Sequence, residues 1–144
     1  MSKPISTNIR VFPLRLPANS NVFEQVRKLI KDADLHSVFI MTCVGSVQSC
    51  RLRLADSTGT MDLNENHEIV SLVGTFDSEG GHIHGSFSDK KGRVIGGHLM
   101  SDIPMIVYTT VEIVLAECID VKFSRQFDEE TGYPELVIER KLFV

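Results

Sequence analysis

The sequence predicts an α+β domain in which one main helix accompanies a central, mostly antiparallel sheet of about seven strands. Two observations carry this prediction. One segment repeats its apolar residues at helical spacing. In the segments after it, apolar and polar residues alternate, or apolar residues form runs of strand length, and turn residues separate these segments. A length of 144 residues with 42% hydrophobic and 24% charged residues suits a single domain over residues 1–144.

The helix is predicted over residues 21–34. Asn21 followed by Glu24 is typical of a capping box, and Pro17 prevents an earlier start. The apolar residues that recur at helical spacing are Phe23, Val26, Leu29, Ile30 and Ala33.

Strands are predicted wherever β-rich or alternating runs end at turn residues. In residues 49–55, for example, Leu52 and Leu54 alternate with Arg51 and Arg53 before a turn at residues 56–59. The other predicted strands, apart from the hairpin described next, are residues 37–44 (ending at Gly45-Ser46), 68–76, 105–115, 118–127 and 135–143.

Three of the five histidines fall between residues 82 and 98, within a predicted hairpin. His82 and His84 share a strand face because residues two apart point the same way. Residues 89–93 suit a three-residue loop with Gly92 in the left-handed position, which sets His84 opposite His98. The sequence therefore predicts that the three imidazoles converge.

The apolar residues of this hairpin support the same register. Odd positions hold Ile83, Phe87, Ile95 and Leu99, whereas the even positions hold the three histidines, Ser86 and Ser88. Neighbouring glycines leave space around the cluster. Three clustered imidazoles are the ligands expected of zinc, with a fourth position left open; the alternative is a polar face whose histidines bond to the backbone or to each other.

Several segments resemble the plant and prokaryote conserved (PPC) domain. The most specific are Gly-His-Ile-His-Gly at 81–85 and Gly-Arg-Val-Ile-Gly-Gly-His-Leu at 92–99. Further matches are residues 44–47 with 51–53, residues 68–76 and residues 109–113. The resemblance implies an α+β fold, a homotrimer, and zinc or another divalent transition metal held by His82, His84 and His98.

Plant members of this family join the domain to AT-hooks and act in the nucleus as DNA-binding transcriptional regulators. This chain has no Arg-Gly-Arg core of an AT-hook and carries a net charge of −4, both of which argue against direct nucleic-acid binding. The plant Gly-Arg-Phe-Glu-Ile-Leu element is only half kept, as Glu-Asn-His-Glu-Ile-Val at residues 65–70. We therefore expect a stand-alone domain of the prokaryotic type.

Three functions from different classes fit these features. The first, which we favour, is a trimeric metal-binding assembly or regulatory module that recognises a small ligand or a protein. The second is a metal-dependent hydrolase in which Glu68 or Glu112 acts as the base. The third is a DNA-associated regulator that acts through a partner. Glu112 interrupts an apolar strand, so we expect either a cationic partner for it, with Arg53 as the candidate, or a place at the mouth of the site.

The sequence also bears on location. Cys43, Cys50 and Cys118 form no CxxC pair and are odd in number, which favours free thiols in a reducing interior. Neither a signal peptide nor an apolar stretch long enough to span a bilayer is present, so we expect a cytoplasmic protein without a membrane partner. A nuclear location is compatible with so small a chain.

Overall fold

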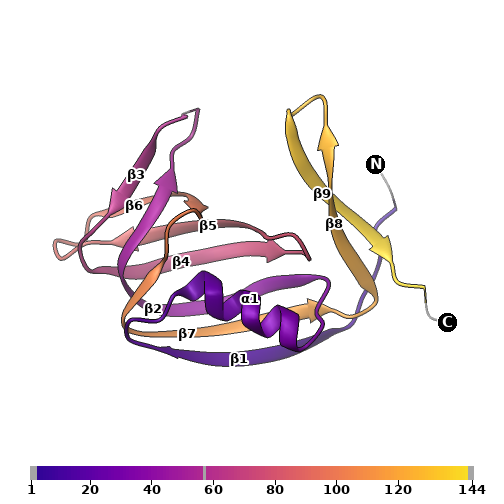
Figure 1. The fold of residues 1–144 in the computed structure, drawn as a ribbon, viewed down its shortest axis with the longest axis horizontal. Coiled ribbons are helices and arrows are strands. Elements are labelled where there is room, and N and C mark those ends of the chain that lie inside the picture. Colours follow the sequence, from indigo (N-terminus) through magenta and orange to yellow (C-terminus); the bar gives the residue numbers. More distant parts are fainter. Residues whose placement is uncertain (1–2, 57, 143–144) are drawn as a thin grey trace.

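Seven strands form the central sheet of the computed structural model, which describes residues 3–56 and 58–142 (Figure 1). In chain order the elements are β1 (Ile9–Pro17), α1 (Val22–Asp32), β2 (Val38–Arg53), β3 (Thr60–Leu63), β4 (His67–Phe76), β5 (Gly81–Ser88), β6 (Val94–Met100), β7 (Ile106–Cys118), β8 (Val121–Asp128) and β9 (Tyr133–Arg140). The strand order is β1-β7-β2-β4-β5-β6, with β3 on β2 and a further β2–β6 pairing. The antiparallel sheet and the helix confirm the predicted fold class.

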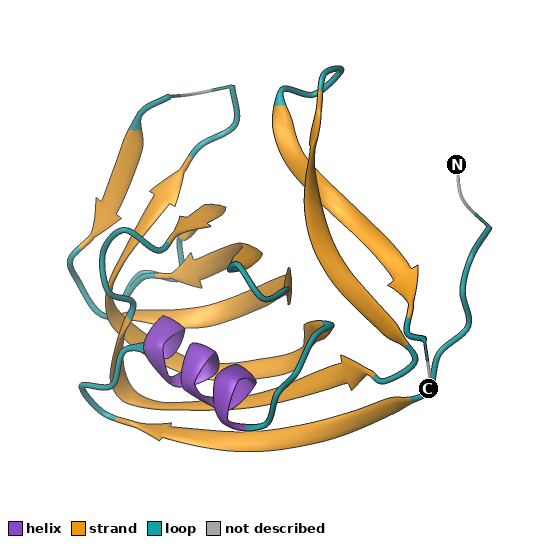
Figure 2. Ribbon diagram, turned by 45° about the vertical axis from the view of Figure 1, so that its right-hand side comes forward, coloured by secondary structure: helices purple, strands orange, loops and turns teal. Residues whose placement is uncertain are grey.

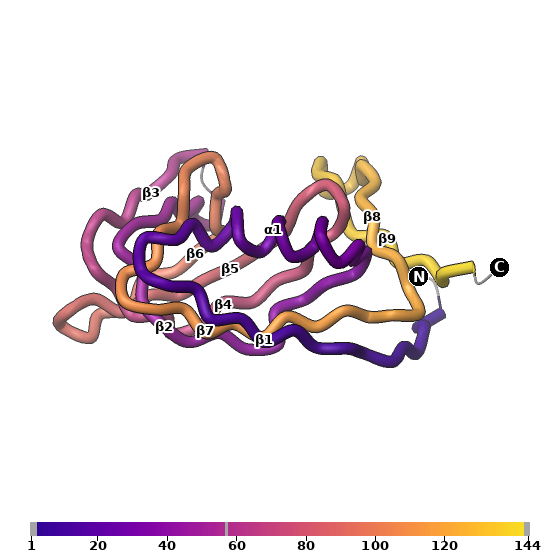
Figure 3. The backbone as a smooth tube through the Cα atoms, turned by 60° about the horizontal axis from the view of Figure 1, so that its bottom comes forward, coloured from indigo at the N-terminus to yellow at the C-terminus, as the bar shows by residue number. Residues whose placement is uncertain are grey.

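The helix lies along one face of the sheet (Figures 2 and 3). The Asn21 side chain caps it by accepting a hydrogen bond from the backbone N–H of Phe23 at 3.2 Å, as the sequence predicts. Phe23 and Val26 are buried against the sheet. The helix ends two residues before the predicted end, and Asp34 takes a φ of 52°, which a right-handed helix does not accommodate. Within residues 3–56 and 58–142 no helix has the length and hydrophobicity needed to cross a membrane.

Strand β2 corrects the prediction of two separate strands at 37–44 and 49–55. It is one 16-residue strand, and the predicted break at Gly45 is instead a register shift against β7. A side chain at Gly45 would come within 2.1 Å of the Thr110 carbonyl oxygen, so only glycine lets the strands approach this closely. The resulting long, bent strand pairs with β7 and β4 along its first part and with β6 at its end.

Two strands of the sheet, β1 and β3, were not predicted. Strand β1 contains Pro13 and Pro17, which count against a strand because proline lacks the N–H that a central strand donates. Strand β1 lies at the edge of the sheet, where proline is tolerated. Strand β3 has only four residues. The predicted strands at 118–127 and 135–143 instead form a separate two-stranded hairpin, β8–β9. Strand β7 already has β1 on one edge and β2 on the other, so it offers no edge to β8.

Alternation along the strands places the histidines on the side of the sheet away from the core. Ile83 and Phe87 of β5 are buried, whereas His82 and His84, on either side of Ile83, are exposed. Strand β6 repeats the pattern, since Leu99 is buried beside the less buried His98. The hydrophobic core thus fixes the strands that carry the histidines and leaves the imidazoles accessible.

Candidate metal centre

The β5–β6 hairpin has the register that the sequence predicts. Its turn closes where the backbone N–H of Asp89 donates to the Arg93 carbonyl at 2.9 Å, with Gly92 at a φ of 76°. The Asp89 carboxylate accepts the backbone N–H of Arg93 at 3.0 Å and so braces the loop. His84 lies directly opposite His98.

The three imidazoles converge on the outer face of this hairpin. The ring centroids of His82 and His84 are 5.0 Å apart, those of His82 and His98 5.2 Å, and those of His84 and His98 5.5 Å. One potential ligand nitrogen from each ring lies within 4.8 Å of the others. The predicted convergence of these side chains is confirmed.

The spacing of the ring nitrogens fits a metal ion. The Nε2 atoms of His82 and His84 lie 3.2 Å apart. Two nitrogens bound to one tetrahedral zinc ion at about 2.0–2.1 Å lie about 3.3 Å from each other. Without a metal, this distance also allows one neutral ring to donate a hydrogen bond to the other. Three neutral imidazoles are the donor set of a zinc site that keeps a fourth position open.

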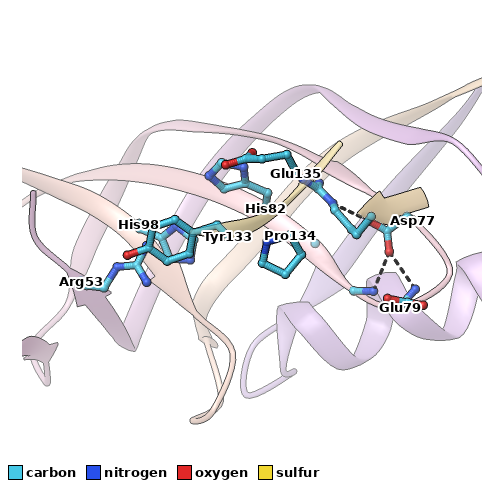
Figure 4. A pocket seen from close by; sticks show the side chains of 11 residues that line it. Arg53, Asp77, Glu79, His82, His98, Tyr133, Pro134 and Glu135 are labelled. Atoms are coloured by element: carbon cyan, nitrogen blue, oxygen red, sulfur yellow. Dashed lines mark hydrogen bonds and ion pairs between the residues drawn. The ribbon is translucent and has the colours of Figure 1, made fainter. Parts of the chain in front are cut away.

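Arg53 reaches the cluster from a third strand. At the end of β2 it pairs directly with His98 of β6. A side chain at Gly97 would lie 2.7 Å from the Arg53 carbonyl oxygen, so glycine is needed for β6 to pack this closely on β2. The Arg53 guanidinium lies 5.7 Å from the centroid of the Tyr133 ring, a cation–π distance (Figure 4).

The surroundings of His82 and His98 favour their neutral forms. Burial and then the Arg53 guanidinium lower the pKa of His98 to about 4, with His82 and His84 acting in the same direction. The pKa of His82 is also lowered, mainly by burial and by His84, although the nearby Glu135 carboxylate acts against the change. Neutral imidazoles have the free lone pair that a metal requires.

In the metal-free protein we expect His98 to titrate near pH 4, well below the usual histidine value of 6.5. The unfolded chain takes up this proton near its ordinary value and the folded chain only near pH 4. The free energy of unfolding should therefore fall as pH decreases from about 6.5 towards 4. NMR titration of the imidazole protons measures the midpoint. Arg53→Gln should raise it, and a wild-type midpoint at or above 6.5 would contradict this electrostatic picture.

The histidines line two neighbouring cavities, the first through His82 and His98 and the second through all three. A cavity of about 380 Å³ separates them from the β8–β9 hairpin (Figure 4), and a neighbouring one of about 500 Å³ extends towards the loop after β2. Both are lined by Arg53, His82, His98 and Tyr133. Volumes of this size suit a small molecule.

The β8–β9 hairpin forms the opposite wall of the first cavity through Arg125, Tyr133, Pro134 and Glu135. It is held against the sheet by Arg125, whose Nε donates to the buried carboxylate of Asp77 at 2.8 Å. Sequence reasoning missed these wall residues. They reach the histidines only because the hairpin docks, and no local pattern in the chain indicates that contact.

The structure does not bring Glu68 or Glu112 to the histidines. Glu68 pairs with Ser88 at the far end of the β4–β5 ladder from His82. Glu112 is exposed and has Arg15 as its neighbour on β1, whereas Arg53 lies at the histidine cluster. The expected Glu112–Arg53 pair is therefore wrong, because β2 carries Arg53 to β6 rather than to β7.

The remaining histidines and the cysteines lie outside the cluster. The His67 ring contacts the Glu65 carbonyl at 2.8 Å, and His36 lies beside Asp34. Burial raises the pKa of the Cys43 and Cys50 thiols to about 12, so both remain protonated at neutral pH. All three cysteines are free; Cys50 is buried, and Cys43 and Cys118 are half-buried.

Comparison with protein families gives one match over most of the chain. The profile of the Plants and Prokaryotes Conserved (PCC) domain matches residues 4–119. A bifunctional protein GlmU from a Synechococcus strain is 40% identical over 139 residues, which are 96% of this chain but 22% of GlmU. The chain thus spans about a fifth of the length of the curated relatives that it matches.

Solved structures share the complete fold. A hypothetical protein from Salmonella cholerae-suis superposes with a TM-score of 0.90 at 35% identity, over 96% of this chain and 99% of that one. A metal-containing protein from Archaeoglobus fulgidus superposes with a TM-score of 0.78 at 25% identity, over 94% and 99% of the two chains. A more distant structure from Bacteroides thetaiotaomicron, provisionally described as DNA-binding, shares the fold at 20% identity, over 96% of each chain and with a TM-score of 0.75.

Proposed function

The chain belongs to the Plants and Prokaryotes Conserved domain family, and on that premise we propose that it is a metal-binding module for a small ligand or a protein partner. His82, His84 and His98 would hold Zn²⁺ or another divalent transition metal. The observation that carries the proposal is the convergence of three ligand nitrogens within 4.8 Å at the wall of a cavity. When bound, the metal would supply a Lewis-acidic position open to a ligand.

Two of the comparisons support this proposal. The similar protein from Archaeoglobus fulgidus is described as containing metal. The GlmU relative carries the matching region as about a fifth of a longer bifunctional protein, as expected for a module that works beside other domains.

We also propose that the module assembles as a homotrimer, as the family resemblance implies. The outer face of the sheet supports self-association, because it exposes apolar side chains at neighbouring positions of β2 and β4. These include Val44 of β2 and Val70 of β4, each 56% exposed.

Native mass spectrometry of protein purified without chelator tests both parts of this proposal. We expect three times the chain mass plus about one metal ion per chain, because each chain carries a complete three-histidine site. A metal-bearing monomer at micromolar concentration would contradict the trimer alone. A trimer that takes up no zinc would contradict the metal module alone.

A metal-dependent hydrolase is the second candidate, and one residue favours it. Glu135 lines the cavity and interacts electrostatically with His82, so it takes the place that the sequence assigned to Glu68 or Glu112. One Glu135 oxygen accepts a hydrogen bond from the Thr131 hydroxyl at 2.8 Å, which leaves the other for a general base. Zinc-dependent hydrolysis of an activated ester that is lost in Glu135→Gln would support this candidate, and equal rates in the two proteins would exclude Glu135.

A link to DNA-based regulation, implied by the plant members, is proposed only through a partner protein. The net charge of −4 supports no direct contact with duplex DNA. A salt-dependent mobility shift of DNA with the purified chain would contradict this reading.

A further inference from the structure

Arg53 is a cation at the candidate metal centre with no acidic partner among the described residues. Its guanidinium stacks over Tyr133, and its backbone pairs with His98. The ion pairs of the described residues join other arginines to carboxylates but include none for Arg53. Across the same cavity, Arg125 is neutralised by Asp77 at 2.8 Å.

The acidic groups around the cavity do not take this role. The Glu135 carboxylate, on the hairpin wall, interacts electrostatically with His82 and accepts a hydrogen bond from Thr131. Asp56 is exposed on the loop after β2, and Glu79 lies at the other end, beside Asp77. None of these carboxylates comes within ion-pair distance of Arg53.

An arginine without a counter-ion beside a metal centre is electrostatically unfavourable. The guanidinium and a divalent cation repel each other strongly in a half-buried site, where water screens charges less than it does in bulk. An anion placed between the guanidinium and the metal ion is attracted to both cations and offsets their mutual repulsion. Arginine suits this task because its planar N–H groups bind the two oxygens of a carboxylate or phosphate side by side.

We propose that the cavity binds a small ligand through an anionic oxygen group, a carboxylate or a phosphate, which sits between Arg53 and the histidine cluster. This inference rests on the metal module proposed above and names its class of ligand. The cavity of about 380 Å³ has room for such a molecule and not for a folded partner. Tyr133 and Pro134 give its wall an apolar surface for the rest of the ligand.

The hairpin wall would contact the part of the ligand that lies beyond its anionic group. The family profile ends at residue 119, whereas Tyr133, Pro134 and Glu135 belong to the β8–β9 hairpin. The histidines and Arg53 lie within the matched region and would hold the anionic group. The hairpin contacts the remainder of the molecule and would select it.

Isothermal titration of inorganic phosphate and of acetate into zinc-loaded protein tests the proposal. The variants are Arg53→Gln, Arg53→Lys and, as a matched control, Arg93→Gln, whose side chain is exposed and paired with Asp89 at the hairpin turn. We expect Arg53→Gln to weaken binding at least about tenfold, in line with loss of a charge-assisted hydrogen bond. Arg53→Lys, which keeps the charge but not the planar fork, should bind with intermediate affinity, and Arg93→Gln within about twofold of the wild type.

The two anions identify the source of the group. If only phosphate binds in an Arg53-dependent way, the ligand carries a phosphate. If only acetate does so, the ligand carries a carboxylate. Binding that is equally strong in Arg53→Gln, or no binding of either anion to the wild type, would overturn the proposal. Metal content is measured first in every variant. A wild type that holds no zinc but binds phosphate through Arg53 would contradict the metal module and leave the anion site standing.

Discussion

A His84→Ala, His98→Ala double variant is expected to lose its metal while it keeps its fold. Only His82 then remains of the three imidazoles, and one imidazole is a weak ligand set. Mutation of residues that only hydrogen-bond to metal ligands lowers metal affinity by about 10–100-fold. Removal of two of the ligands themselves should therefore lower it by more than about 100-fold. Metal content after gel filtration measures the effect.

Stability should change little in this double variant. His84 is exposed and His98 only partly buried, and neither side chain belongs to the hydrophobic core. Substitutions at such positions shift the free energy of unfolding by about 0.5 kcal/mol or less in metal-free protein. His36→Ala is the matched control, because His36 lies outside the cluster beside Asp34. Equal metal content in the double variant and the control would refute the three-histidine site.

Gly97→Ala is expected to damage both the fold and the site. The new methyl group would lie 2.7 Å from the Arg53 carbonyl oxygen, a backbone atom that can retreat only if β6 separates from β2. Such overpacking costs about 1–3 kcal/mol. The same movement displaces His98 and Arg53, which pair across these strands, so zinc affinity should fall as well.

Gly80→Ala provides the control for this glycine substitution. A methyl group at Gly80 meets no atom within 4 Å, although the residue borders the same cavity. Its free energy of unfolding should stay within about 0.5 kcal/mol of the wild type. Urea unfolding and zinc titration compare the two variants. If Gly97→Ala were as stable as Gly80→Ala, the close packing of β6 on β2 would not be a constraint on the site.

The histidine cluster could be predicted because its determinants are local. The loop from Asp89 to Arg93 and the alternation along β5 and β6 fix the register of His84 on His98 within one hairpin. The helix was predictable for the same reason, since its cap at Asn21 and its apolar face lie within one segment.

The rest of the site depends on contacts between distant segments. Arg53 joins the histidines through the β2–β6 pairing, which brings together strands more than forty residues apart in the sequence. Tyr133 and Glu135 arrive with a hairpin that docks by the Asp77–Arg125 ion pair rather than by joining the sheet. Spacing along the chain carries no signal for either contact, so Glu68 and Glu112 were weighed as bases instead.

X-ray absorption at the zinc K edge of zinc-loaded protein tests the central claim most directly, because it reports the atoms that touch the metal. The account predicts nitrogen and oxygen ligands at about 2.0–2.1 Å, with the outer-shell scattering of three imidazole rings from His82, His84 and His98. Sulfur ligands at about 2.3 Å would assign the metal to cysteine, and a shell without imidazole scattering would place it away from the histidines. Either result would contradict the account.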